Sequence, residues 1–164
     1  MEERFSAEWQ AVLDYALSLE GATSDQPFEE DFVTTVLRHS DSGKWFGLLM
    51  KVHPKKVGRQ GEEPLELLNL KADPEDGMVA RELFDAILPA YHMNKTHWIT
   101  VVLDGSVPKP FINRMIAKSY LLTKKRGKNL ENEKNQMDKT ALPACGGDSA
   151  LRAFAVLQWA VDHR

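Results

Sequence analysis

Apolar side chains recur every three or four positions in three stretches of the chain, a spacing that predicts amphipathic helices. In the first stretch Ser6 is suited to cap the helix. The residues expected on its apolar face are Trp9, Val12, Leu13, Ala16 and Leu17. In the second, Pro74 occupies the position that proline favours, the first helical residue. The expected helices span residues 7–20, 74–87 and 108–123.

Between these helices the apolar positions follow strand-like patterns bounded by Gly, Pro, Asn and Asp. Strands joined by short turns pair antiparallel, and helices must then cover one face of the sheet. The pattern therefore predicts an α+β, two-layer fold with a five-stranded antiparallel sheet. The strands are expected over residues 32–39, 44–52, 65–72 and 97–104, with one more just before the Asn94-Lys95 turn.

Strict alternation along the strands assigns several aromatic and basic side chains to the sheet face that the helices leave open. Two interpretations of this face remain open. In the first, the face stacks bases and holds phosphates. In the second, the last helix or a partner subunit covers its rings, because large exposed apolar surfaces usually mark protein contacts. The side chains assigned to this face are Trp45, Leu49, Lys51, Trp98 and Thr100, joined by Asn69 and Lys71.

The chain beyond the third helix changes character. Residues 129–140 are polar and show no periodicity, and a Gly-Gly pair precedes a strongly apolar segment that predicts a last helix over residues 148–163. The expected organisation is an α+β domain over residues 1–125, a linker over 126–147 and a C-terminal helical extension over 148–164.

Charge is unevenly distributed behind a net value of −3. Residues 1–35 hold nine acids and one base, whereas residues 36–128 hold sixteen bases and ten acids. A basic middle could attract an anionic partner, because local potential governs association. An ordinary solvated surface explains the same numbers, since the isoelectric point near 6.0 is low for a nucleic-acid-binding domain.

Composition also bears on location and cofactors. No apolar run approaches the roughly 20 residues that cross a bilayer, so no membrane association is expected. The acidic start predicts no signal peptide, and the lone Cys145 excludes an internal disulfide. These features predict a cytoplasmic protein. No cofactor is expected.

Six segments together resemble the MmcQ/YjbR family over about residues 28–125. The resemblance implies a five-stranded antiparallel sheet with helices packed on it, similar to the type III secretion chaperones. It extends no further, so nothing carries over to the last forty residues. The segments are Leu37-Arg38-His39, Gly43-Lys44-Trp45-Phe46-Gly47-Leu48-Leu49, Asn69-Leu70-Lys71-Ala72-Asp73-Pro74, Pro89-Ala90-Tyr91-His92-Met93-Asn94-Lys95, His97-Trp98-Ile99-Thr100-Val101 and Ser119-Tyr120.

The same resemblance implies DNA binding through a "double wing", two hairpins that grip the duplex. Here the wings would fall at residues 53–64 and 93–96. Their lysines could contact phosphates, or they could be ordinary solvated loop lysines; Glu62 and Glu63 in the first wing weaken the DNA interpretation. The residues expected to contact nucleic acid are Lys51, Lys55, Lys56, Arg59, Lys71, Lys95, His97 and Trp98.

No catalytic or metal site is expected. His92 and His97 flank a turn, but no Asp, Glu or Cys lies beside them to complete a tetrahedral metal site. A histidine that acts as a general base needs a nucleophile or substrate group to deprotonate, and the sequence shows no such partner for either histidine. The leading hypothesis is weak, salt-dependent DNA binding without enzyme activity. The alternative is a chaperone-like adaptor that binds a protein partner, or a second copy of itself, through the open sheet face.

Overall fold

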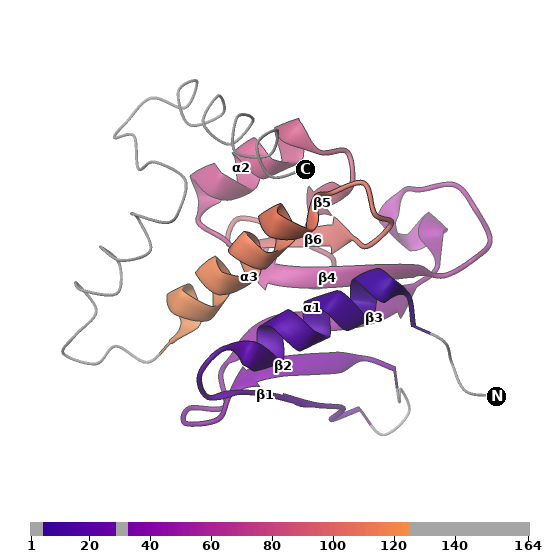
Figure 1. Ribbon diagram of the computed structural model, residues 1–164. Helices are drawn as coiled ribbons and strands as arrows, with labels where there is room; N and C mark the ends of the chain where they lie inside the picture. Colours follow the sequence, from indigo (N-terminus) through magenta and orange to yellow (C-terminus); the bar gives the residue numbers. More distant parts are fainter. Residues whose placement is uncertain (1–4, 29–32, 125–164) are drawn as a thin grey trace.

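The computed structural model of the protein describes residues 5–28 and 33–124, which form one antiparallel sheet with helices packed against it (Figure 1). The strands lie in the order β1-β2-β3-β4-β6-β5, and each neighbouring pair is antiparallel. They are β1 (Ala22–Asp25), β2 (Thr35–His39), β3 (Trp45–Val52), β4 (Leu65–Lys71), β5 (Ile87–Pro89) and β6 (Trp98–Val102). The helices are α1 (Ala7–Ser18), α2 (Pro74–Leu83) and α3 (Lys109–Thr123), with a 3-10 turn, η1 (Pro54–Val57).

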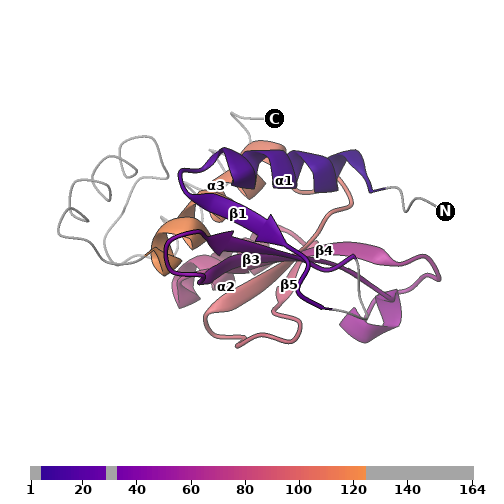
Figure 2. The same ribbon diagram turned by 90° about the horizontal axis from the view of Figure 1, so that it is seen from below.

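The elements form two layers. Helices α1 and α3 contact each other and cover one face of the sheet, while α2 packs against β5 and β6 (Figure 1). Figure 2 shows η1 and the segment between β5 and β6 on the opposite side of the sheet from α1 and α3. The predicted two-layer α+β fold with an antiparallel sheet is confirmed, but the sheet has six strands rather than the expected five.

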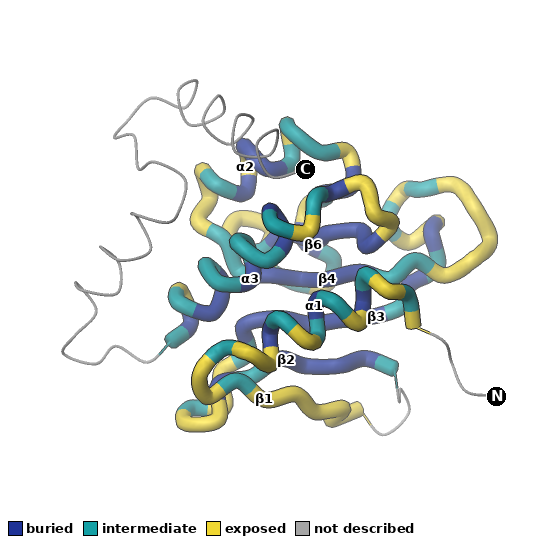
Figure 3. Tube along the Cα trace, in the orientation of Figure 1, coloured by how far each residue is buried: buried dark blue, intermediate teal, exposed yellow. Residues whose placement is uncertain are grey.

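The additional strand is β1, at the edge of the sheet. Its four residues pair with β2 from Ala22 opposite His39 to Asp25 opposite Val36, yet three of them are exposed (Figure 3). An edge strand that contributes almost nothing to the core has no hydrophobic alternation by which it could be detected. The sequence pattern therefore predicted no strand over these residues.

Helix α1 begins where predicted. The Ser6 hydroxyl accepts a hydrogen bond from the backbone N–H of Trp9 (3.1 Å), and the Glu66 carboxylate of β4 accepts from the Ser6 hydroxyl and from its N–H (3.0 Å). A carboxylate at this position also suits the positive end of the helix dipole. Of the predicted apolar face, Trp9, Val12 and Ala16 are buried and Leu13 is partly buried, whereas Leu17 is 40% exposed.

The second helix is shorter than predicted. Helix α2 ends at Leu83, and Ile87 already belongs to β5, where it pairs with Val101. The short apolar run that follows Leu83 is compatible with a further helical turn and with a buried strand. Periodicity alone could therefore not locate the end of α2. Helix α3 follows its prediction closely, covering Lys109–Thr123.

Between α3 and the sheet the core includes the imidazole of His39. It is 3 % exposed, and its ring packs on Tyr120 and Phe46 at 4.7 and 5.2 Å between ring centroids. The Thr123 hydroxyl donates to the Ser119 carbonyl (2.8 Å), so its oxygen accepts a hydrogen bond from His39 Nε2 (2.7 Å). Burial lowers the pKa of His39, partly offset by the nearby Asp41 carboxylate. The folded protein therefore favours the neutral imidazole.

We expect stability to fall as the pH decreases below the unfolded-state value for histidine, about 6.5. Below that pH the unfolded chain binds a proton at His39 that the folded chain resists, so the free energy of unfolding decreases until the lowered folded-state pKa is reached. Chemical denaturation across this range should show a steeper loss in the wild type than in His39→Gln. Parallel curves for the two proteins would contradict this assignment.

Part of the chain cannot be compared with its prediction. The expected linker, residues 126–147, and helical extension, residues 148–164, lie outside the described residues, so the proposed domain boundaries stay predictions. Within residues 5–28 and 33–124, no helix combines the length and apolar character needed to cross a membrane. The cytoplasmic location also stays a prediction.

Candidate functional site

A β-bulge in β3 decides which side chains face away from the helices. Gly47 pairs with Leu37 of β2, but Trp45 pairs with the very next β2 residue, so Phe46 is an extra residue in the ladder. The Phe46 ring turns toward α3 and contacts Tyr120 edge-on, 5.5 Å between ring centroids. Trp45 remains on the open face.

The bulge overturns part of the predicted alternation. Leu49 and Lys51 face the helices rather than the open side, and the Lys51 ammonium lies 4.7 Å from the centre of the Phe5 ring, which stacks on Trp9 of α1. The prediction that placed them on the open face is wrong, because it assumed an unbulged strand. The β3 residues that share the open face with Trp45 are Leu48, Met50 and Val52.

A buried hydrogen-bond network holds the segment between β5 and β6 against this face. The Asn69 side-chain amide donates to the Tyr91 carbonyl (2.7 Å), and its oxygen accepts from the Thr100 hydroxyl (2.5 Å). The Thr100 oxygen accepts in turn from the Tyr91 N–H (2.9 Å). Asn69 and Thr100 are fully buried, where hydrogen bonds are stronger than in water. We call these three residues the Asn69 clamp.

The segment that follows, residues 91–97, forms a structured loop. The Asn94 side-chain oxygen accepts hydrogen bonds from the N–H groups of Thr96 (2.9 Å) and His97 (3.2 Å), which closes a turn at the tip. His92 has φ 58°, the single non-glycine residue with positive φ in the described part of the chain, and its ring packs on Tyr91. Because the left-handed conformation costs about 1–2 kcal/mol for an L-residue, the surrounding contacts must hold it.

Residues 53–64 form the second loop of this face. It begins with η1, where His53 Nδ1 accepts a hydrogen bond from the Lys55 N–H (3.2 Å). The Glu62 carboxylate lies 3.7 Å from His53 and 3.9 Å from the Lys55 ammonium, so it neutralises part of the loop's positive charge. The Arg59 guanidinium donates to the Asp85 carbonyl (2.5 Å), which fastens the loop to the α2–β5 connection.

Between the two loops the open face is hollowed into a groove of about 500 Å³. Its floor consists of aliphatic and thioether side chains of β3, and aromatic rings, two histidines and Lys56 surround them. None of the described lining residues is acidic. We call this set of residues the groove: Phe28, Thr34, Trp45, Leu48, Met50, Lys51, Val52, His53, Lys56, Tyr91, His92 and Met93.

The groove gathers only part of the predicted nucleic-acid set. Lys56 borders it. Lys51 is among its lining residues, but its ammonium lies on the helical side of the sheet, beside the Phe5 ring. Lys71 and Trp98 pair with each other across β4 and β6 and are not among the described groove residues. Arg59 is held by its bond to the Asp85 carbonyl. Lys55, Lys95 and His97 are exposed on the two loops beside the groove.

Sequence reasoning missed the groove floor and the Phe28 ring. The available signal was Gly47, because a glycine inside a strand often marks a bulge or a close approach. A Cβ at Gly47 would lie 2.7 Å from Cδ1 of Leu37, so no larger residue fits this site without movement of the core. A bulge placed there would have assigned Leu48 and Met50 to the open face.

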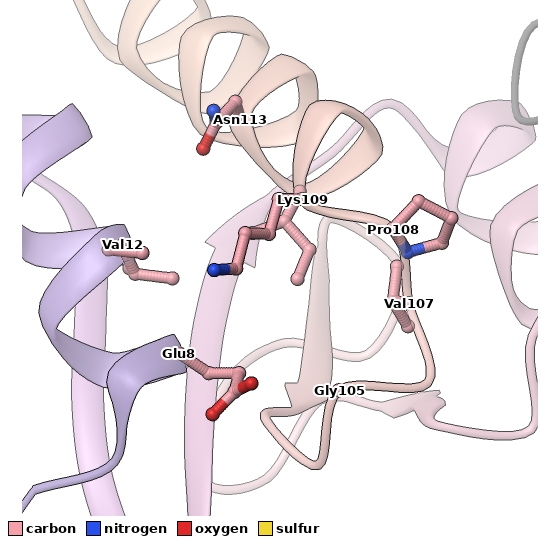
Figure 4. Close-up of a pocket in the computed structure, with 9 residues that line it drawn as sticks. Glu8, Val12, Gly105, Val107, Pro108, Lys109 and Asn113 are labelled. Atoms are coloured by element: carbon pink, nitrogen blue, oxygen red, sulfur yellow. The ribbon is translucent and has the colours of Figure 1, made fainter. Parts of the chain in front are cut away.

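Two other hollows are less suited to a ligand. The first, between α1 and the start of α3, holds about 90 Å³, and the Glu8 and Lys109 side chains extend into it (Figure 4). The second, of about 540 Å³, lies beside Ser6 and is bordered by the acidic residues Glu63, Glu66 and Asp104. Neither combines aromatic rings with a basic rim as the groove does.

No metal site is formed by the described residues, since no three His, Cys, Asp or Glu side chains gather there. His92 and His97 are both exposed, one beside the groove and the other beyond the Asn94 turn. That the protein is not an enzyme stays a prediction.

The six-stranded antiparallel sheet, with helices on one face and two loops with a groove on the other, defines the class of α+β protein to which this chain belongs. The family model described as YjbR matches residues 17–122, and the chain is a member of that family. The matched span contains both loops and every described groove residue.

Relatives share this domain but their names carry no activity. The chain is 41% identical over 104 residues to YyaQ of Bacillus subtilis (strain 168), covering 63% of this chain and 87% of that protein. It is 28% identical to YjbR of Escherichia coli (strain K12), covering 66% and 80%. Both are described as uncharacterised proteins. A crystal structure of a Pseudomonas syringae protein superposes with a TM-score of 0.64 at 39% identity, covering 70% of this chain and 97% of that one.

Proposed function

We propose that the protein binds nucleic acid weakly through the open sheet face, using the loops at residues 53–64 and 91–97. The observation that carries this proposal is that both loops border one groove: His53 and Lys56 come from the first, and Tyr91 and His92 from the second. These two pairs of residues are more than thirty positions apart in the sequence, yet their side chains border the same groove. This arrangement suits a backbone held by phosphate contacts beside an aromatic surface.

The charge on this face supports weak rather than tight binding. Lys55, Lys56 and Lys95 are exposed on the loops, but Glu62 offsets part of that charge and Arg59 is engaged elsewhere. A few phosphate contacts produce affinity that decreases strongly with salt and depends little on sequence. We infer a binding role rather than a catalytic one, because the described groove residues include no carboxylate or thiol to assist the histidines.

The test is a fluorescence anisotropy titration of labelled oligonucleotides at low and near-physiological salt, with wild type, Lys56→Gln and Lys109→Gln. Lys109 is an equally exposed lysine at the start of α3, on the helical side of the sheet, so it serves as the matched control. We expect Lys56→Gln to weaken binding and to reduce the slope of log affinity against log salt by about 0.7–0.9, the change for one phosphate contact. Lys109→Gln should leave both quantities unchanged.

Equal effects of the two substitutions would show that binding is not located on the open face. Absence of binding at low salt would leave the second candidate, a protein-interaction role. The observation that favours that role is the apolar groove floor together with Phe28, whose ring is 40% exposed. It predicts a stable complex with a partner, or with a second copy, that is insensitive to Lys56→Gln.

A further inference from the structure

We infer that the groove receives an unpaired nucleobase, so that the protein prefers single-stranded nucleic acid to duplex. This inference rests on the proposed function and specifies the ligand of that same site. A grip on duplex by two loops would need only the exposed lysines at their tips. The structure also offers a recess between the loops, and that recess requires an explanation.

The recess is large enough for a nucleobase. Its volume of about 500 Å³ lies within the roughly 300–1,000 Å³ typical of small-molecule sites. The Trp45 and Tyr91 rings border a floor that includes Leu48 and Met50. In a duplex the faces of the bases are covered by stacking, and only their edges are accessible in the grooves. An unpaired base can present its whole face to an aromatic side chain.

The polar groups around the recess suit the phosphate attached to such a base. Lys56, His53 and His92 border the groove, and its described residues include no acid. The neighbouring Lys55 forms an ion pair with Glu62. The Lys56 side chain is exposed and does not form that ion pair. An uncharged apolar side chain of a protein partner would fill the floor but leave these groups unused. Charge complementarity therefore favours a nucleotide over a hydrophobic peptide.

The loop that bears His92 is held against the sheet by buried hydrogen bonds. The Asn69 clamp fixes both the N–H and the carbonyl of Tyr91, and His92 is held at φ 58° directly after it. Backbone held in a sparsely populated conformation is concentrated at ligand sites, where it directs a side chain. A loop that already has its binding conformation loses less conformational entropy when the ligand binds.

The experiment compares a short labelled oligothymidylate with a labelled duplex of the same length, at low salt, for wild type, Trp45→Leu and Lys109→Gln. We expect the single strand to bind about tenfold more tightly than the duplex, a difference of the size of one base–aromatic stack. Trp45→Leu should remove that preference and leave duplex binding unchanged. The leucine keeps the position apolar, and circular dichroism checks that the variant folds.

A second measurement uses the wild type alone. Thymidine monophosphate should shift the amide resonances of Trp45, Met50, Tyr91 and His92, and inorganic phosphate at the same concentration should not shift that of Met50. Equal affinity for single strand and duplex in the wild type, or an unchanged preference in a folded Trp45→Leu, would overturn the inference while the proposed function stands. If neither oligonucleotide binds at low salt, the proposed function fails with it.

Discussion

Replacing Ser119 by alanine is expected to lower the free energy of unfolding by about 2–4 kcal/mol. The Ser119 hydroxyl is fully buried where β3 and β4 separate: it donates to the Phe46 carbonyl and accepts from the Lys71 N–H (2.9 Å). The last ladder pair on this side joins Gly47 to Leu70, so the hydroxyl supplies the hydrogen bonds that the next pair would make. Alanine leaves both backbone groups buried without that partner, at a cost of about 1–3 kcal/mol for each.

The matched control is Ser18→Ala. The Ser18 hydroxyl also bonds a backbone carbonyl, that of Tyr15, but it does so at the exposed end of α1. Water can replace this bond, so we expect a change within about 0.5 kcal/mol. Urea denaturation of the two variants and the wild type measures the difference. A loss below about 1 kcal/mol in Ser119→Ala would show that the strands close over the gap or that water enters it.

The parts of the fold that the sequence predicted are those whose side chains repeat with a clear period. Helix α1 was expected from the spacing of Trp9, Val12 and Ala16, and all three are buried. Edge strand β1 was missed because three of its four residues are exposed and show no alternation of buried positions. The end of α2 was misplaced because Ile87 extends a helical pattern while it belongs to a strand. Periodicity reports burial, so it fails where an element is exposed or where two buried elements adjoin.

The candidate site was less predictable for a different reason. The sequence identified both loops and the aromatic character of the face, but a single extra residue, Phe46, reversed the side on which Leu49 and Lys51 lie. A one-residue change of register moves every following side chain to the other face. The Asn69 clamp is equally invisible to pattern analysis, because Asn69 is more than twenty positions from Tyr91 and Thr100 and meets them only when β4 pairs with β6.

The clamp is also why Asn69 has two expected roles, one in stability and one in binding. Asn69→Ala should lower the free energy of unfolding by about 2–4 kcal/mol, since it leaves the Tyr91 carbonyl and the Thr100 hydroxyl without their buried partner. It should also weaken nucleic-acid binding at temperatures where the protein remains folded, because the Tyr91–His92 wall of the groove loses its anchor.

Hydrogen exchange separates these two roles. In Asn69→Ala the Tyr91 N–H should exchange much faster than in the wild type, whereas the β2–β3 amides should change only by the amount that the global loss of stability explains. The control is Asn94→Ala, which removes the bonds to Thr96 and His97 at the loop tip and leaves the clamp intact. If Asn94→Ala weakened single-strand binding as much as Asn69→Ala does, the tip rather than the groove wall would be the contact. If only Asn69→Ala does so, the buried amide serves the groove by fixing the backbone that presents Tyr91 and His92 to it.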